Sequence, residues 1–207
     1  MRERQGARFD NLEFWEERYR TNIALGSGGG SRGDALRFKR ELLTSLLERL
    51  QPRTVLDIGC GDIEVTRDLA LTGAYTGIDI SPYVIERNRA LRPDWEFRQG
   101  DFVAMAREEA LQADLVLCFD VLIHQHDRET YRAFVRELLR SSRVALLVNG
   151  FETFPPSGRM SPNVAYHEPL SQTLREAGAA EIEPLATFRR MLIALVPAAA
   201  PGGQGPG

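Results

Sequence analysis

The segment that most constrains the fold of this chain is a short apolar run that ends at two glycines separated by one residue. The sequence VLDIGCGD carries a predicted strand over 54–58 through Gly59 and Gly61 into a predicted helix over 62–71. A strand that turns into a helix in this way is typical of open α/β sheets, in which ligands bind beyond the carboxyl ends of the strands. Because glycine has no Cβ, the backbone can turn sharply there and approach a ligand closely.

The chain after this segment continues to alternate between strand and helix. Further strands are predicted at 74–80, 95–98, 113–119 and 143–148, and further helices at 82–91, at 102–110 and after the N-cap Asp127. The run ADLVLCF at 113–119 is almost continuously apolar, as expected where helices cover both faces of a sheet. We therefore predict an α/β fold with a doubly wound, Rossmann-like sheet that is mostly parallel.

The two ends of the chain differ from this alternation. Residues 9–20 carry apolar side chains at helical spacing, and the glycine-rich stretch 26–33 is expected to hold no regular element and to be mobile. Asp34 is predicted to cap a second helix that runs to about residue 50. Toward the C-terminus we expect a loop over 150–166, a helix over 169–177, and strands at 181–186 and 190–196 that form an antiparallel hairpin. These boundaries divide the chain into an N-terminal helix with a glycine-rich lid (1–33), a ligand-binding domain (34–197) and a disordered tail (198–207).

Composition limits the class of protein. A length of 207 residues suffices for one domain, and 43% hydrophobic with 27% charged residues is typical of a globular chain. The net charge of -3 provides no basic excess for a phosphate backbone, so no nucleic-acid partner is expected. Cys60 and Cys118 are too few for a disulfide framework, and neither a signal peptide nor a membrane-length apolar run is evident. We expect a cytoplasmic protein with free thiols and no membrane contact, as a monomer or a homodimer.

Acidic residues accompany three of the predicted strands. Asp57 precedes the first glycine, Asp79 ends the second strand and Asp101 follows the third. Asp79 has the spacing from the turn, about twenty residues, at which an acid binds ribose hydroxyls in nucleotide-binding folds. The third glycine position of a dinucleotide motif is Glu64, close to Asp62, and two carboxylates there would repel a pyrophosphate. The pattern favours a positively charged nucleoside without phosphates, such as S-adenosylmethionine.

Four motifs together resemble one known superfamily. VLDIGCGD, GIDIS, GDF and ADLVLCFDVLIH, in this order and spacing, are similar to the class I S-adenosylmethionine-dependent methyltransferases, over roughly residues 46–196. The FWEERYR segment and the glycine-rich stretch resemble small bacterial methyltransferases, often of secondary metabolism or carbohydrate modification. The chain departs from many members at Ile63, where they have a further glycine, and this side chain would narrow the pocket.

The resemblance implies a set of contacts between the rim of the sheet and the cofactor. The turn would approach the methionine part, and the ends of the second and third strands would bind the adenosine part. The implied cofactor residues are Tyr19 in the lid; Asp57, Gly59, Cys60 and Gly61 at the turn; Asp79 for ribose; Ile80 and the pair Asp101 and Phe102 for adenine; and Phe119, whose carbonyl would face the methionine ammonium.

The histidines raise two further questions. Methyl transfer is an in-line displacement, so an enzyme mainly aligns the acceptor and, where required, removes its proton. His124, after the fourth predicted strand, and His167, after the long loop, are the candidate bases, and each also has a purely structural interpretation. His124 and His126 invite a metal hypothesis, but their ring nitrogens need not converge, and no metal is predicted.

The sequence thus predicts methyl transfer from S-adenosylmethionine to an oxygen or nitrogen of a small-molecule acceptor, with release of S-adenosyl-L-homocysteine. Residues 150–167, with Phe151, Phe154, Met160 and Tyr166, are expected to shape a partly apolar acceptor pocket. Two alternatives stay open. One is another displacement on the same cofactor, which would yield methylthioadenosine, and the other is a non-catalytic regulator that keeps the fold.

Overall fold

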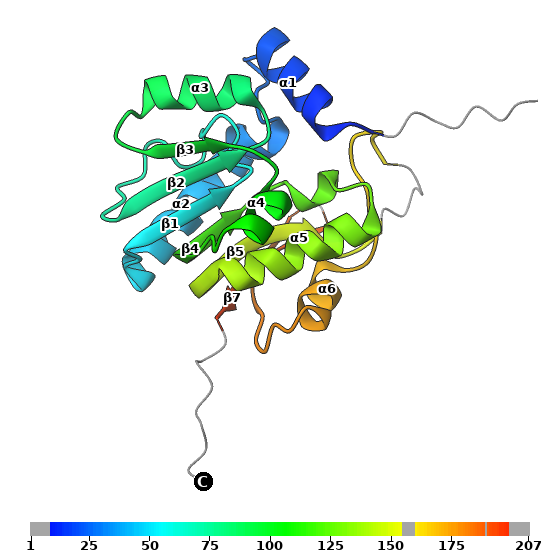
Figure 1. The fold of residues 1–207 in the computed structure, drawn as a ribbon. Helices are drawn as coiled ribbons and strands as arrows, with labels where there is room; N and C mark the ends of the chain where they lie inside the picture. The colour runs from blue at the N-terminus through cyan, green and yellow to red at the C-terminus, as the bar shows by residue number, and fades with distance from the viewer. Residues whose placement is uncertain (1–8, 155–159, 189, 199–207) are drawn as a thin grey trace, which may run out of the picture.

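The computed structural model describes residues 9–154, 160–188 and 190–198. Its helices and strands alternate through most of the chain (Figure 1). In chain order they are α1 (Asn11–Thr21), the 3-10 turn η1 (Gly29–Ser31), α2 (Gly33–Leu50), β1 (Thr54–Ile58), β2 (Ala74–Asp79), α3 (Pro82–Leu91), β3 (Glu96–Gln99), α4 (Phe102–Glu108), β4 (Ala113–Cys118), the 3-10 turn η2 (Leu122–His124), α5 (Arg128–Ser141), β5 (Ser142–Phe151), α6 (Leu170–Glu176), β6 (Glu183–Phe188) and β7 (Met191–Pro197).

The strands form one seven-stranded sheet in the order β3-β2-β1-β4-β5-β7-β6. Strands β1 to β5 are mutually parallel, whereas β7 runs antiparallel to both β5 and β6. The predicted doubly wound, mostly parallel sheet with an antiparallel C-terminal hairpin is confirmed. The strand order reverses between β1 and β4, and this reversal is the switch point at which open α/β sheets bind ligands.

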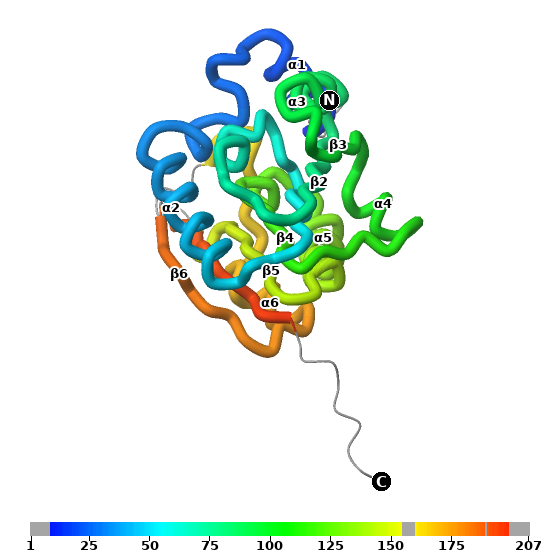
Figure 2. The backbone as a smooth tube through the Cα atoms, turned by 90° about the vertical axis from the view of Figure 1, so that its left-hand side faces the viewer, coloured from blue at the N-terminus to red at the C-terminus, as the bar shows by residue number. Residues whose placement is uncertain are grey.

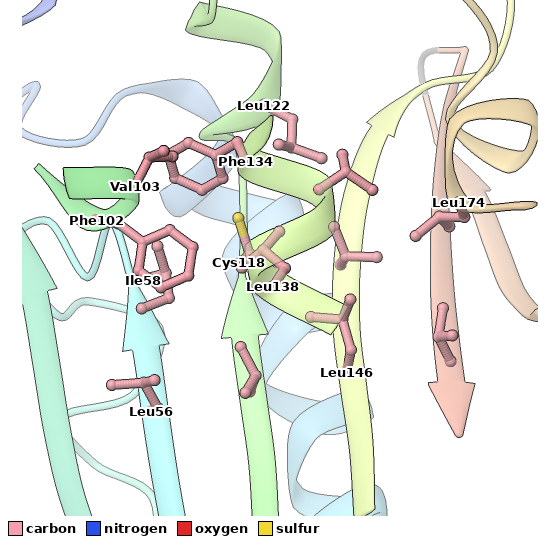
Figure 3. Close-up of a cluster of buried hydrophobic side chains, with 14 of the residues drawn as sticks. Leu56, Ile58, Phe102, Val103, Cys118, Leu122, Phe134, Leu138, Leu146 and Leu174 are labelled. Carbon is pink, nitrogen blue, oxygen red and sulfur yellow. The ribbon is translucent and has the colours of Figure 1, made fainter. Parts of the chain in front are cut away.

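Alternating side chains along each strand build a core on either face of the sheet. Leu56 and Ile58 of β1 point to the face covered by α4, α5 and α6, where they pack near Phe102 and Leu138 (Figure 3). Val55 belongs to the opposite core, which α1, α2 and α3 cover. Figure 2 shows α2 on one side of the sheet and α4 and α5 on the other. The period of two along the buried strands therefore fixes the two layers of helices.

The prediction of a helix over 62–71 is wrong. This stretch forms successive turns, in which the Ile63 amide donates to the Cys60 carbonyl and the Thr66 amide to the Ile63 carbonyl, at 3.1 Å each. Ile63 is almost fully buried and has a φ of 52°, in the left-handed region that a β-branched residue rarely adopts. A left-handed residue interrupts the helical hydrogen-bond pattern, so the apolar side chains here are buried by turns instead.

Two expectations about the N-terminal part are also corrected. Helix α2 begins at Gly33 with Arg32 at the N-cap position, so Asp34 lies inside the first turn, where it pairs with Arg37. The glycine-rich stretch, expected to hold no regular element, contains η1. Its amide and hydroxyl groups find partners elsewhere in the fold, which are described with the site below.

The C-terminal half departs from the prediction in one place. Strand β5 continues to Phe151, into the predicted loop, because Gly150 and Phe151 pair with Leu192 and Met191 of β7. Residues 199–207 of the predicted tail lie outside the described residues. Within the part of the chain that the structure describes, no helix is both long and apolar enough to cross a membrane.

Candidate active site

A cavity of about 230 Å³ lies at the carboxyl ends of β1, β2 and β4, beside the reversal of strand order. The structure brings nearly all the predicted cofactor residues to this one place. The wall includes Tyr19, Asp57, Gly59, Cys60, Asp79, Ile80, Asp101, Phe102 and Phe119, together with the candidate base His124. Gly61 is the one member of the predicted set that does not line the wall.

The glycine turn after β1 is possible only without side chains. Gly59 and Gly61 have φ values of 69° and 54°, and a Cβ on Gly59 would lie 2.2 Å from Cγ2 of Val121. The Gly61 amide donates a hydrogen bond of 3.0 Å to Oδ2 of Asp79. Gly61 therefore acts on the cavity indirectly, by orienting the carboxylate at the end of β2.

Asp57 and Asp79 are two buried carboxylates on the same wall. Burial raises the pKa of each from 3.8 to about 6, against the hydrogen bonds that favour the ionised forms. Those bonds come from the Tyr75 hydroxyl to Asp57, at 2.7 Å, and from the Gly61 and Ser81 amides to Asp79. Each carboxylate lacks a basic side chain as a direct ion-pair partner among the described residues. A positively charged ligand would provide these carboxylates with the counter-charge that the protein does not.

Asp101 and Phe102 line the cavity but also have structural roles. Oδ1 of Asp101 accepts a hydrogen bond of 2.8 Å from the Ala104 amide and so caps α4. The Phe102 ring is 3% exposed and packs 5.0 Å from the Phe134 ring. An aspartate directly after a strand can be predicted from the sequence as a helix N-cap, and here the same residue also lines the cavity.

Helix α1 is held over the edge of the cavity by contacts that the sequence did not reveal. Oε2 of Glu16 accepts hydrogen bonds from the Ser81 hydroxyl at 2.6 Å and the Tyr83 amide at 3.2 Å, at the start of α3. Asn11 donates to the His124 carbonyl at 2.9 Å and lines the cavity. These polar contacts join segments that are distant in the chain, so a local sequence pattern cannot predict them.

Asp62 fastens the glycine-rich segment to the turn after β1. Its carboxylate accepts from the Ser27 amide at 3.1 Å and the Ser27 hydroxyl at 2.8 Å, and it pairs with Arg32 at 2.6 Å. It is 2% exposed. The sequence-based expectation that Asp62 and Glu64 face the ligand is wrong: Asp62 binds the lid segment and Glu64 pairs with Arg67.

The two candidate bases lie in different places. Nδ1 of His124 is 2.5 Å from the Asn163 carbonyl, and burial lowers the pKa of this imidazole, which favours its neutral form. With Nδ1 donating to that carbonyl, Nε2 carries the free lone pair. His167 lies outside the large cavity, with Nε2 2.8 Å from the Gln125 carbonyl. The His126 ring stacks on Phe9, and the described residues contain no group of three side chains placed to hold a metal.

A second cavity of about 220 Å³ adjoins the first. The two share Trp15, Ser27, Asp120 and His124. Its other walls come from the glycine-rich segment, the start of α2 and the β6–β7 hairpin. Of the described residues in the predicted acceptor loop, Asn163 alone lines this cavity, whereas Phe151 and Tyr166 line a separate hollow of about 10 Å³. Phe154 is half exposed.

Comparison with known proteins agrees with this geometry. Residues 55–144 match a family model described as a methyltransferase domain. A ubiquinone biosynthesis O-methyltransferase of Paracidovorax citrulli is 36% identical over 87 residues, which cover 39% of this chain and 37% of the relative. The counterpart in Bordetella avium is 36% identical over 92 residues, 42% of this chain and 38% of the relative. The match thus spans well under half of either curated relative.

Solved structures share the fold at low sequence identity. The N-methyltransferase NodS of Bradyrhizobium japonicum, in complex with S-adenosylhomocysteine, superposes with a TM-score of 0.69 at 17% identity, covering 90% of this chain and 99% of that one. Magnesium protoporphyrin IX methyltransferase of Synechocystis, with bound S-adenosylhomocysteine, gives a TM-score of 0.63 at 17% identity, covering 90% and 99%. Residues 55–144 therefore match a methyltransferase-domain model, and the chain as a whole shares the fold and strand order of these two methyltransferases.

Proposed function

We propose that this protein transfers the methyl group of S-adenosylmethionine to an oxygen or nitrogen of a small molecule. The observation that carries the proposal is the pair of buried carboxylates, Asp57 and Asp79, on the wall of a cavity at the switch point of the sheet. S-adenosylmethionine is a nucleoside without phosphates that carries sulfonium and ammonium charges. Two negatively charged acceptor groups on the wall therefore fit this cofactor better than a dinucleotide, whose pyrophosphate they would repel.

Different residues of the first cavity are proposed to bind different parts of the cofactor. In the proposal, Asp79 accepts the ribose hydroxyls, Ile80, Asp101 and Phe102 bind adenine, and the turn at Gly59 lies against the methionine part. Tyr19 and Phe119 complete the wall. The bound cofactor supplies an electrophilic methyl carbon, to which the acceptor atom bonds while the carbon–sulfur bond breaks and its electron pair stays on sulfur.

His124 is the proposed general base. It lines both cavities, its ring is fixed by the Asn163 carbonyl, and the low pKa keeps it neutral, so that Nε2 can take the acceptor proton. His167 has no such position and is left out of the proposed mechanism. From the sequence features we also propose an acceptor from secondary metabolism or sugar chemistry and a cytoplasmic location.

Incubation with S-adenosylmethionine labelled in its methyl group and a panel of candidate acceptors tests the proposal. We expect mass spectrometry to detect S-adenosylhomocysteine and a labelled acceptor in equal amounts. Methylthioadenosine as the nucleoside product would show a different displacement on the same cofactor. Failure of the full chain to bind either nucleoside by calorimetry would contradict the proposal outright.

A further inference from the structure

The second cavity has a mostly apolar wall that is left open at the surface. Phe38 of α2 and Phe188 of β6 line it and are 39% and 40% exposed, among the most exposed large apolar side chains of the described residues. Met191 and Ile193 of β7 and Ile123 of η2 line it as well. Exposed aromatic side chains around a hollow are typical of a site for a compact apolar ligand.

The charged groups in the depth of this cavity neutralise one another. Nζ of Lys39 lies 2.5 Å from Oδ2 of Asp120 and 2.8 Å from the Gly30 carbonyl, and this lysine is 4% exposed. Asn149 donates to Oδ1 of Asp120 at 2.7 Å. The lysine also lies 5.0 Å from the ring centroid of Phe119. This cluster therefore presents no net charge to a ligand, and its hydrogen-bonding capacity is largely used within the protein.

Arg18 is the cation of this wall that keeps free capacity. Its Nε donates to the Gly26 carbonyl at 2.9 Å, and its guanidinium lies 5.2 Å from the Trp15 ring centroid. Among the described residues, no carboxylate forms an ion pair with it. Asp34, the other acidic residue of the wall besides Asp120, is exposed and pairs with Arg37. A guanidinium with unused N–H groups beside an apolar hollow suits an anionic group on the ligand.

The guanidinium and the proposed base both contact the same indole. The Trp15 ring lies 4.9 Å from the His124 ring, edge to face, as well as under Arg18. A ligand that packs along this wall therefore meets an imidazole and a guanidinium at neighbouring points. Such a neighbouring imidazole and guanidinium would suit a molecule that carries a hydroxyl and an anionic group on one flat apolar frame.

We propose that the second cavity is the acceptor site and that the acceptor is a compact hydroxyarene carrying a carboxylate or a similar anionic group. The arene packs against Phe38 and Phe188, the anion pairs with Arg18, and the hydroxyl faces His124. This inference rests on the proposed function, because it assumes that the neighbouring cavity holds the cofactor. It moves the determinants of acceptor choice from the 150–167 loop to the glycine-rich segment, the start of α2 and the terminal hairpin.

Calorimetry on the full chain saturated with S-adenosylhomocysteine provides the test. The probes are para-hydroxybenzoate, meta-hydroxybenzoate and protocatechuate. Each is compared with the neutral benzyl alcohol that carries the same ring hydroxyls and has a hydroxymethyl group in place of the carboxylate. We expect the carboxylates to bind at least about tenfold more tightly than the alcohols, since a charge-assisted pair is stronger than a neutral hydrogen bond. Arg18→Ala should remove this preference, whereas Arg20→Ala, on the exposed side of the same helix, should keep it.

A cavity-filling variant locates the binding independently of charge. Ala35 lines the second cavity and not the first, so Ala35→Phe should abolish binding of the arenes and leave the dissociation constant of S-adenosylhomocysteine unchanged. That second constant also reports that each variant is folded. If the wild-type chain binds S-adenosylhomocysteine but no member of the panel, or binds acids and alcohols equally, or if Ala35→Phe still binds the acids, the inference is overturned. If S-adenosylhomocysteine itself does not bind, the proposed function fails first.

Discussion

At the scale of single residues, the site depends on where buried charges can be tolerated. Asp57 and Asp79 accept hydrogen bonds from neutral groups, and neither carboxylate has a basic side chain as an ion-pair partner among the described residues. Sequence spacing was enough to place both at one rim, because parallel strands end at the same edge of a sheet. It could not show that Asp62, in the same motif, turns away to bind Ser27, since that contact joins segments 35 positions apart.

Loss of Asp79 should weaken cofactor binding. The carboxylate is the proposed partner of the ribose hydroxyls, so Asp79→Ala should lower the affinity for S-adenosylhomocysteine by about 1–3 kcal/mol, the cost of leaving buried polar groups without a partner. Asp94→Ala, at an exposed surface pair with Arg92, is the control and should leave the affinity unchanged. Equal dissociation constants for wild type and Asp79→Ala by calorimetry would remove this assignment.

Affinity for S-adenosylmethionine should rise with pH. The pKa values of Asp57 and Asp79 are raised from 3.8 to about 6, so in the free protein both are largely protonated below pH 6. Their contribution to folding stability is therefore present below pH 3.8 and is lost as pH rises through about 6. A cation prefers the ionised forms, so its binding should follow the opposite course and strengthen through the same range. Calorimetry across this range checks the trend, and Asp57→Asn should flatten it.

Removal of the proposed base should slow catalysis without weakening the cofactor site. His124→Gln should lower kcat by about 10²–10⁴-fold, the usual contribution of a positioned base. His167→Gln is the matched control, because that ring lies outside both large cavities, and it should retain activity within a few-fold. A larger loss of activity in His167→Gln than in His124→Gln would reverse the assignment.

At the scale of elements, the central strands and the helices after them were readable from the sequence because apolar periodicity reports burial. Three features were not readable. The turns at 62–71 depend on the left-handed Ile63, the extension of β5 depends on pairing with β7, and the second cavity is built from segments at both ends of the chain. Each is decided by tertiary contacts that a local pattern does not contain.

The glycine-rich segment should lose its protection when its anchor is removed. Asp62→Ala deletes the acceptor of the Ser27 and Arg32 contacts, so we expect faster amide exchange over residues 26–32 and unchanged exchange in β4. Asp68→Ala removes a carboxylate that is 61% exposed and should alter neither region. Hydrogen–deuterium exchange with mass detection measures both, and unaltered exchange at 26–32 in Asp62→Ala would show that the segment is held in some other way.

At the scale of the whole molecule, one sheet joins the two cores, and the site lies where both helical layers meet its rim. Leu117 faces one core and Leu146 the other, and both are almost fully buried. Leu117→Ala or Leu146→Ala should each lower the free energy of unfolding by about 2–5 kcal/mol, because the cavity left behind adds to the lost apolar burial. Urea unfolding followed by circular dichroism and by tryptophan fluorescence should give coincident transitions, and separate transitions would show that the two layers unfold independently.

The proposed function requires that the acidic rim at the ends of β1 and β2 bind an adenosyl compound. A crystal structure of the full chain with S-adenosylhomocysteine would show whether it does. We expect electron density for the nucleoside in the first cavity, with the ribose hydroxyls on the Asp79 carboxylate and the adenine beside Ile80 and Phe102. A nucleoside seated anywhere else on the molecule, with this cavity filled only by water, would contradict it.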